Sequence, residues 1–129
     1  MVRIVDFADL AGAYAARLFA ETGNEVIRVE NLSGDRLRTL PPFLDDAPDG
    51  ENSAYHQFVN AGKKSLALDL DAAAGREVFY RLIAKADVLI SGRDPALDEA
   101  RLLEANPRLV WTRIEDDDPD ICALARSGL

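Results

Sequence analysis

One stretch near the start of the chain constrains the fold more than any other: residues 11–31, AGAYAARLFAETGNEVIRVEN. A short apolar strand, Ile4 to Phe7, leads through Gly12 into a helix, and a second strand then ends at the acidic Glu30. A strand, a helix and a second strand in this order form one unit of a parallel sheet, because the helix returns the chain to the edge it started from. Nucleotide-like ligands usually bind where the strands of such units end.

The composition is that of an ordinary globular domain. The chain has 129 residues, of which 48% are hydrophobic and 29% charged, enough for one domain with a core. No stretch reaches the ~20 apolar residues of a membrane helix, and charged residues interrupt the N-terminal region, so no signal peptide is predicted. The net charge of −8 would repel a nucleic-acid backbone. We expect neither a membrane nor a nucleic acid as a partner.

Two side chains that often carry chemistry occur once each. Cys122 has no second cysteine with which to form an internal disulfide, which favours a reducing, cytoplasmic location. His56 lies in a short amphipathic segment without a nearby acid to orient it, so a packed or surface histidine is favoured over a catalytic base. No catalytic residue is predicted from either.

The first half of the chain reads as two strand–helix pairs joined by a long loop. A helix from about Leu10 to Thr22 is expected to turn one face to the sheet, and Gly23 suits a left-handed residue that ends it. The strand Val26–Val29 follows. Residues 31–52 are rich in proline, glycine and aspartate and predict a surface loop, followed by a helix over Ser53–Asn60 and a strand over Ser65–Asp69. The face predicted for the first helix comprises Ala11, Tyr14, Ala15, Leu18 and Thr22.

The second half continues the alternation. Asp71 is a candidate N-cap for a helix starting near Ala72, and the strand Val88–Ile90 comes next. Asp94-Pro95 is expected to open another helix that ends by Asn106-Pro107, since the residue before proline avoids the helical conformation. A last strand, Leu109–Ile114, precedes a helix over Ile121–Ser127. The apolar face of the helix near Ala72 comprises Val78, Phe79, Leu82, Ile83 and Ala86. The sequence therefore predicts one α/β domain, residues 1–129, with a three-layer, mainly parallel sheet.

Several patterns suggest ligands, and each has a simpler interpretation. A dinucleotide-binding turn needs three glycines, whereas only Gly12 is present, so a nicotinamide cofactor is disfavoured even though Glu30 lies where a ribose-binding carboxylate would. Lys63 and Lys64 could hold a diphosphate, but the spacing alone favours a solvated turn. The acidic run at 115–120 lacks the pattern of a calcium loop, so no metal site is predicted. Trp111 and Tyr14 are expected in the core.

Four motifs in order resemble one enzyme family. They are the opening stretch up to Glu30, the segment Asn60–Leu70, the strand that follows Ala86, and the segment Leu103–Trp111. Together they resemble the class III CoA-transferases, which include formyl-CoA transferase, the carnitine-CoA transferases and α-methylacyl-CoA racemase. The resemblance extends through Ile121–Leu129, nearly the whole chain.

The resemblance implies a Rossmann-like N-terminal part of the family's large domain. Members of the family form interlocked homodimers and move CoA from an acyl-CoA to a carboxylate through intermediates on an aspartate. The resemblance implies coenzyme A as a substrate that is not bound covalently. By the same analogy the CoA-facing positions are Leu10, Ala11, Gly12 and Leu68, with Lys63 and Lys64 as candidate phosphate partners.

The chain departs from the family pattern at the positions that carry chemistry. The family's nucleophilic aspartate lies beyond the Ser-Gly helix, so no residue up to Leu129 can be given that role, and the racemase histidine would fall at about Pro119. Ser91-Gly92-Arg93-Asp94 stands where the family usually has asparagine followed by an aromatic residue or arginine. The acidic run at 115–120 replaces a glycine-rich loop and would repel phosphates. We therefore expect CoA binding to be weak or absent in this chain.

Two interpretations follow. The chain is either the N-terminal region of a CoA-transferase-like protein, as a fragment or a degenerate half that is not competent in catalysis by itself, or a free-standing nucleotide-binding or interaction module that keeps the fold. On the first interpretation its partner is a second copy in a homodimer or the remainder of a longer chain. The sequence does not identify the acyl donor or the acceptor.

Overall fold

The computed structural model describes residues 1–114 and confirms a parallel α/β sheet. Five parallel strands lie in the order β3-β2-β1-β4-β5. The strands are β1 (Arg3–Phe7), β2 (Glu25–Glu30), β3 (Lys64–Ala67), β4 (Val88–Ser91) and β5 (Val110–Arg113). The helices are α1 (Leu10–Glu21), α2 (Ala54–Asn60), α3 (Ala73–Ile83) and α4 (Glu99–Ala105), with short 3-10 turns at Arg36–Thr39 and Leu44–Asp46.

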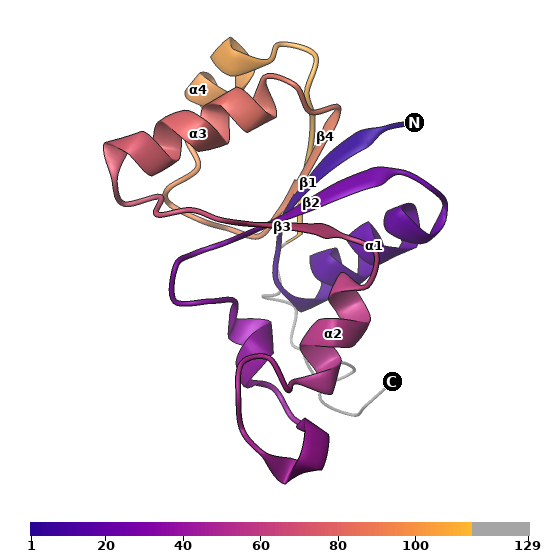
Figure 1. The fold of residues 1–129 in the computed structure, drawn as a ribbon. Helices are drawn as coiled ribbons and strands as arrows, with labels where there is room; N and C mark the ends of the chain where they lie inside the picture. The colour runs from indigo at the N-terminus through magenta and orange to yellow at the C-terminus, as the bar shows by residue number, and fades with distance from the viewer. Residues whose placement is uncertain (115–129) are drawn as a thin grey trace.

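The helices cover both faces of the sheet (Figure 1): α3 and α4 lie on one face, α1 and α2 on the other. Successive residues of β1 point to opposite faces, as in any strand. Val5 accordingly packs in the core beneath α3 and α4, while Ile4 packs in the core beneath α1. Both side chains are fully buried. β1 is thus an interior strand with a core on either side, as a parallel sheet requires.

The face that α1 turns to the sheet differs from the predicted one. Gly12, Ala13 and Ala16 are its buried residues, whereas Tyr14 and Leu18 are each 47% exposed. The reason is close approach, because a Cβ on Gly12 would lie 2.2 Å from the Cβ of Ala8. Large side chains therefore cannot lie between helix and sheet, and apolar spacing alone picked the wrong face.

The aromatic residues expected in the core behave differently from each other. Tyr14 lies at the surface, where its ring stacks on Phe58 of α2 with 6.3 Å between centroids. The prediction that Tyr14 is a core residue is therefore wrong. Trp111 of β5 is partly buried and packs against the core beneath α3 and α4. Gly23 ends α1 with φ of 87°, the left-handed conformation that was predicted.

Two helix starts were misplaced. The N-cap of α3 is Ala72 rather than Asp71, because the Asp69 carboxylate accepts the backbone N–H groups of both residues (3.0 and 3.3 Å). α4 begins at Glu99, capped by Asp98, and not at Pro95. Aspartates favour turns as well as helix caps, so the sequence signal was ambiguous. The end of α4 at Asn106 was predicted correctly.

The segment 31–52 is more ordered than a surface loop. Leu37, in the turn Arg36–Thr39, is fully buried beside Ala13 and Val59. Ser53 is buried too, and its hydroxyl donates to the carbonyl of Leu40 (2.6 Å) while capping α2 at the N–H of His56 (3.2 Å). The acidic run at 115–120 and the predicted helix 121–127 lie outside the described residues. Within residues 1–114, no helix has the length and apolar character needed to cross a membrane.

Candidate functional site

The carboxyl ends of β1 and β4 meet at the centre of the sheet, where Phe7 pairs with Ser91. From β1 the chain turns to α1 on one face, and from β4 it continues to α4 on the other (Figure 1). When the chain leaves neighbouring parallel strands toward opposite faces, a crevice forms between them at the carboxyl edge. This edge is the first candidate site.

The first turn of α1 forms one wall of the carboxyl edge. Asp9 caps the helix by accepting the N–H of Leu10 (3.0 Å), and its other oxygen pairs with Arg36 (2.6 Å). Gly12 lets this turn lie against β1 and β4, since a Cβ there would also approach Cγ2 of Ile90 to 3.3 Å. Leu10 and Ala11 are partly exposed, whereas Gly12 is buried.

The β4 wall of the carboxyl edge is fixed by a buried hydroxyl. Ser91 is fully buried, and its Oγ accepts a hydrogen bond from Nε1 of Trp111 (2.9 Å). Its carbonyl accepts the N–H of Ile114 (2.8 Å). The end of β4 is therefore tied to β5 through both main chain and side chain. The hydroxyl and the carbonyl of Ser91 therefore have a structural role at this edge.

The turn after β3 is held against the start of α3. Leu68 is buried, and its N–H donates to the carbonyl of Glu30 (2.8 Å). Gly75 permits the contact that follows, because a Cβ there would lie 1.8 Å from the carbonyl oxygen of Asp69. Arg76 donates to the carbonyls of Leu70 and Asp71 (2.9 and 2.6 Å). This turn is rigid.

A buried ion network lies beneath α1 and α2, and the sequence analysis missed it. At its centre Asp6, with no exposed surface, accepts hydrogen bonds from Arg28 (2.8 Å) and Lys63 (2.7 Å). Arg28 also pairs with Asp35. Desolvation lowers the pKa of Arg28, but the charges of Asp6 and Asp35 outweigh it, so the pKa is raised. The sequence does contain one indication of this network, because Asp6 and Arg28 are charged residues within two interior strands, where a charge needs a partner.

Glu30 extends the network to the segment 31–52. Its two carboxylate oxygens accept hydrogen bonds from Nε and Nη2 of Arg38 (2.8 and 2.9 Å), which makes the pair bidentate. One of these oxygens also accepts a hydrogen bond from the backbone N–H of Asp35 (3.0 Å). The hydrogen bonds from Arg38 lower the pKa of Glu30 to about 2, against the opposing effect of burial. Both oxygens are thus engaged by protein groups, which disfavours the ribose-binding role considered from the sequence.

His56 comes near this pair from α2. Its Nε2 lies 4.0 Å from Oε1 of Glu30, and burial lowers the pKa of His56, with the charge of Arg38 acting in the same direction. Among the described residues, Glu30, Asp35 and His56 place ligand atoms within 4.8 Å of one another. Arg28 and Arg38 already neutralise the two carboxylates, so a cation would have to compete with guanidinium groups.

The two lysines have different surroundings. Lys63 was expected to be exposed, but only 1% of its side chain is, and its ammonium donates to Asp6, the carbonyl of Ala13 and Oδ1 of Asn60. Burial lowers the pKa of Lys63 despite the nearby charge of Asp6. Lys64 is 70% exposed and pairs with Glu25 (2.6 Å) at the amino end of β2, away from the carboxyl edge. Whether either contacts CoA remains a prediction.

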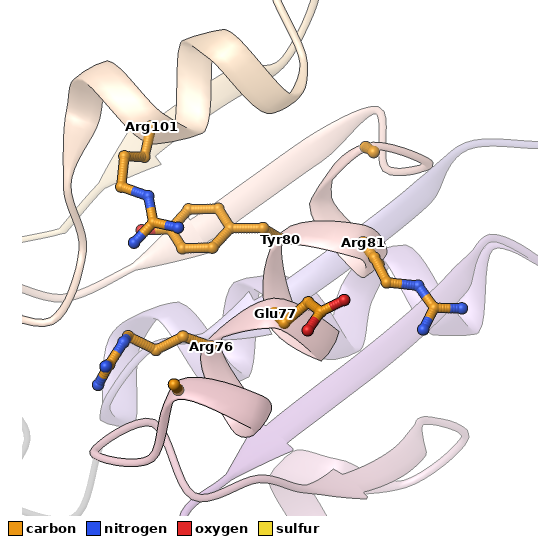
Figure 2. Close-up of a pocket in the computed structure, with 7 residues that line it drawn as sticks. Arg76, Glu77, Tyr80, Arg81 and Arg101 are labelled. Atoms are coloured by element: carbon orange, nitrogen blue, oxygen red, sulfur yellow. The ribbon is translucent and has the colours of Figure 1, made fainter.

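Apart from the carboxyl edge, a hollow of about 510 Å³ lies between α3 and α4. Figure 2 shows Tyr80 beneath the guanidinium of Arg101, with Arg76, Glu77 and Arg81 along α3. The guanidinium carbon of Arg101 lies 4.4 Å from the centre of the Tyr80 ring, so the contact helps hold α4 against α3.

Comparisons with known proteins agree on one family. The model of CoA-transferase family III matches residues 2–116. The succinyl-CoA:mesaconate CoA-transferase of Haloarcula hispanica is 37% identical over 135 residues, which cover 98% of this chain and 34% of that protein. The succinyl-CoA:(R)-benzylsuccinate CoA-transferase subunit BbsE of Thauera aromatica is 38% identical over 118 residues, covering 87% and 29% of the two chains. The chain thus spans about a third of the length of these curated relatives.

Solved structures show the same relationship. A CAIB/BAIF family protein from Brucella suis superposes with a TM-score of 0.76 at 35% identity, covering 87% of this chain and 32% of that one. Rv3272 from Mycobacterium tuberculosis also gives a TM-score of 0.76, at 30% identity, and covers 88% of this chain and 33% of its own.

The two adjacent lysines allow a test of the ion network. Lys63→Ala removes one partner of Asp6 and leaves buried charge uncompensated, which we expect to cost about 3–5 kcal/mol in the free energy of unfolding. Lys64→Ala removes only an exposed pair and should leave it nearly unchanged. Urea denaturation of both variants measures the difference. Equal stabilities for the two variants would contradict the buried network.

The lowered pKa of Glu30 predicts a pH dependence. Because this pKa falls from the usual 4.5 to about 2 on folding, the ionised carboxylate stabilises the protein above pH 4.5, and that contribution is lost as the pH falls toward 2. The free energy of unfolding of wild type should therefore exceed that of Glu30→Gln, and the difference should be largest near neutral pH. Below pH 4.5 the difference should become smaller. Denaturant unfolding across this range measures the gap. Glu104→Gln, at an exposed position, is the control, and its gap should not vary in the same way.

Proposed function

Because this chain belongs to CoA-transferase family III, we propose that it forms part of an enzyme that transfers CoA from an acyl-CoA to a carboxylate, and that by itself it contacts CoA only weakly. The observation that carries the proposal is the carboxyl edge between β1 and β4, where Gly12 brings the first turn of α1 against both strands. A rigid edge at a topological switch point is the usual place for a nucleotide-like ligand in an open parallel sheet. CoA is such a ligand, since it carries an adenosine diphosphate.

At this edge we assign contacts with CoA to the first turn of α1 and the end of β3. Leu10 and Ala11 are partly exposed and can touch a ligand directly. Gly12 and Leu68 are buried, so their contribution is to shape the edge from below. The ammonium of Lys63 already has three protein acceptors, so Lys63 is not among these contacts.

The transfer step needs a group that this chain does not supply. In the family that the sequence resembles, CoA passes through intermediates on an aspartate that follows the Ser-Gly helix. We infer that this carboxylate comes from the remainder of a longer chain or from a different subunit. The share of the curated relatives that is covered, 34% and 29%, supports this inference.

The missing nucleophile leads to a test of turnover. The 129-residue chain alone should transfer no CoA from succinyl-CoA or formyl-CoA to a carboxylate, because the covalent intermediate cannot form without the carboxylate that carries it. Chromatographic detection of the new thioester measures this. Transfer by the purified chain above the rate of spontaneous hydrolysis would overturn the proposal that the nucleophilic carboxylate lies outside this chain.

The charge balance leads to a test of affinity. CoA brings several negative phosphate charges to a protein of net charge −8, and family positions that usually offer polar or basic groups are changed here. Each lost charge-assisted hydrogen bond is worth roughly 1.5–3 kcal/mol, so we expect a dissociation constant poorer than ~0.1 mM. Calorimetry at low salt measures this dissociation constant. A micromolar value would show that the edge holds CoA without those groups.

A further inference from the structure

The face of the sheet on the side of α1 is covered only in part. One row of paired residues on this face runs across four strands, from Val26 through Ile4 and Val88 to Val110. Val26 and Ile4 are buried beneath α1, Val88 is half-buried, and Val110 is 59% exposed. On the opposite face α3 and α4 cover the same strands, and Leu89 of β4 is fully buried there. Within residues 1–114 the sheet therefore lacks a layer over β4 and β5 on the side of α1.

Phe19 of α1 borders this uncovered area. It comes two turns after Gly12, on the stripe of the helix that faces β4, since a Cβ on Gly12 would lie 3.3 Å from Cγ2 of Ile90. α1 ends beside the amino ends of the strands, where Val88 and Val110 begin β4 and β5. Phe19 is 44% exposed at this end of the helix. We call Phe19, Val88 and Val110 the β5 patch.

The β5 patch differs from the other exposed apolar area of the molecule, on α1 and α2. There the ring of Tyr14 stacks on Phe58, and the guanidinium of Arg17 lies over the Phe58 ring at 3.8 Å, so these side chains already cover one another. The β5 patch instead includes a face of the sheet, and parallel sheets normally have both faces covered. An apolar surface left open in this way marks a contact with another segment of polypeptide.

The chain leaves β5 on the same face as the patch. The backbone N–H of Ile114 donates to the carbonyl of Ser91 (2.8 Å), which continues the pairing of β5 with β4. The side chain of Ile114 packs with the core beneath α1, and its Cδ1 would lie 3.5 Å from a Cβ on Gly12. The polypeptide that follows Ile114 therefore starts beside the uncovered half of the sheet.

The sequence that follows contains a segment with an apolar face. Residues 121–127 read ICALARS, in which Ile121, Leu124 and Ala125 recur at helical spacing, while Ala123 and Arg126 fall on the other side. Such a segment can turn aliphatic side chains to the patch and keep its charge in water.

The connection is long enough for this segment to reach the patch. The six residues 115–120 can span up to ~20 Å. β5, with four residues, is only ~13 Å long. Asp120 also suits the N-cap of a helix that begins at Ile121.

We propose that residues 121–127 dock on the β5 patch and cover β4 and β5 on the side of α1. The segment is tethered to β5, so it meets the patch at a high effective concentration. A second copy of the chain is a poorer occupant, because two molecules of net charge −8 repel each other. The proposal is independent of CoA binding and of the proposed function.

Cys122 gives a direct test, because it is the only cysteine of the chain and accepts a nitroxide label without any substitution. The full chain with ¹³C-labelled methyl groups is compared by NMR before and after the nitroxide is reduced with ascorbate. We expect the label to remove most of the intensity of the Val88 and Val110 methyl signals. Val78 is the reference, since it is 40% exposed on α3, on the opposite face, and should keep its intensity.

Two matched variants test which face of the segment docks. Leu124→Asp places a charge on the apolar face, and we expect it to restore the Val110 signal. Ala123→Asp makes the same change of charge on the other side, so the Val110 signal should remain weak. Equal intensities in the two variants would contradict docking through the apolar face.

The other possible occupants give different results in the same measurement. Loss of the Val78 signal in place of the Val110 signal would overturn the proposal, because it places the segment on the face of α3 and α4, as a right-handed crossover to a further strand requires. A mixture of ¹³C-labelled chain and nitroxide-labelled unlabelled chain detects a second copy. Loss of the Val110 signal in that mixture, or in neither sample, would also overturn the proposal.

Discussion

The structure depends on one buried carboxylate, that of Asp6. It lies in the central strand, has no contact with solvent, and receives hydrogen bonds from Arg28 of the neighbouring strand and from Lys63 in the loop between α2 and β3. Such a charge is tolerated in a protein interior only when cations and hydrogen bonds surround it. The backbone of Ala8 also donates to it (3.2 Å), so the same carboxylate fixes the turn that leads into α1.

This network explains how segments far apart in sequence form one side of the molecule. Lys63 reaches from the loop after α2 to the carbonyl of Ala13 in α1, a separation of 50 residues. Glu30 and Arg28 hold the segment that carries Asp35 and Arg38 against the end of β2. The rigidity of the carboxyl edge therefore rests partly on charges below it as well as on the apolar cores. An edge fixed in this way can meet a ligand without rearranging first.

The two faces of the sheet are packed with different kinds of side chain. The face beneath α3 and α4 is filled by large apolar side chains such as Phe79 and Ile83, and its hollow is a surface feature between helices. The other face has small residues beneath α1 and charged residues beneath α2, and it contains the buried polar atoms that lack partners. Strands of a parallel sheet are mostly apolar on both faces, so the charged residues on one side of β1 and β2 set the two faces of this sheet apart.

The sequence by itself determined the order of strands and helices and the parallel sheet, because apolar strands, Gly23 and the proline after Asn106 each act through local physics. The family followed from the resemblance of four motifs in order. It did not determine which face of α1 is buried, since the 2.2 Å approach of Gly12 to Ala8 arises only when helix meets sheet. Nor did it show that Lys63 is buried while Lys64 is exposed, although the two are adjacent. That difference depends on Asp6, 57 residues away. Only tertiary structure brings such charges together, because their attraction depends on distance and on the exclusion of water.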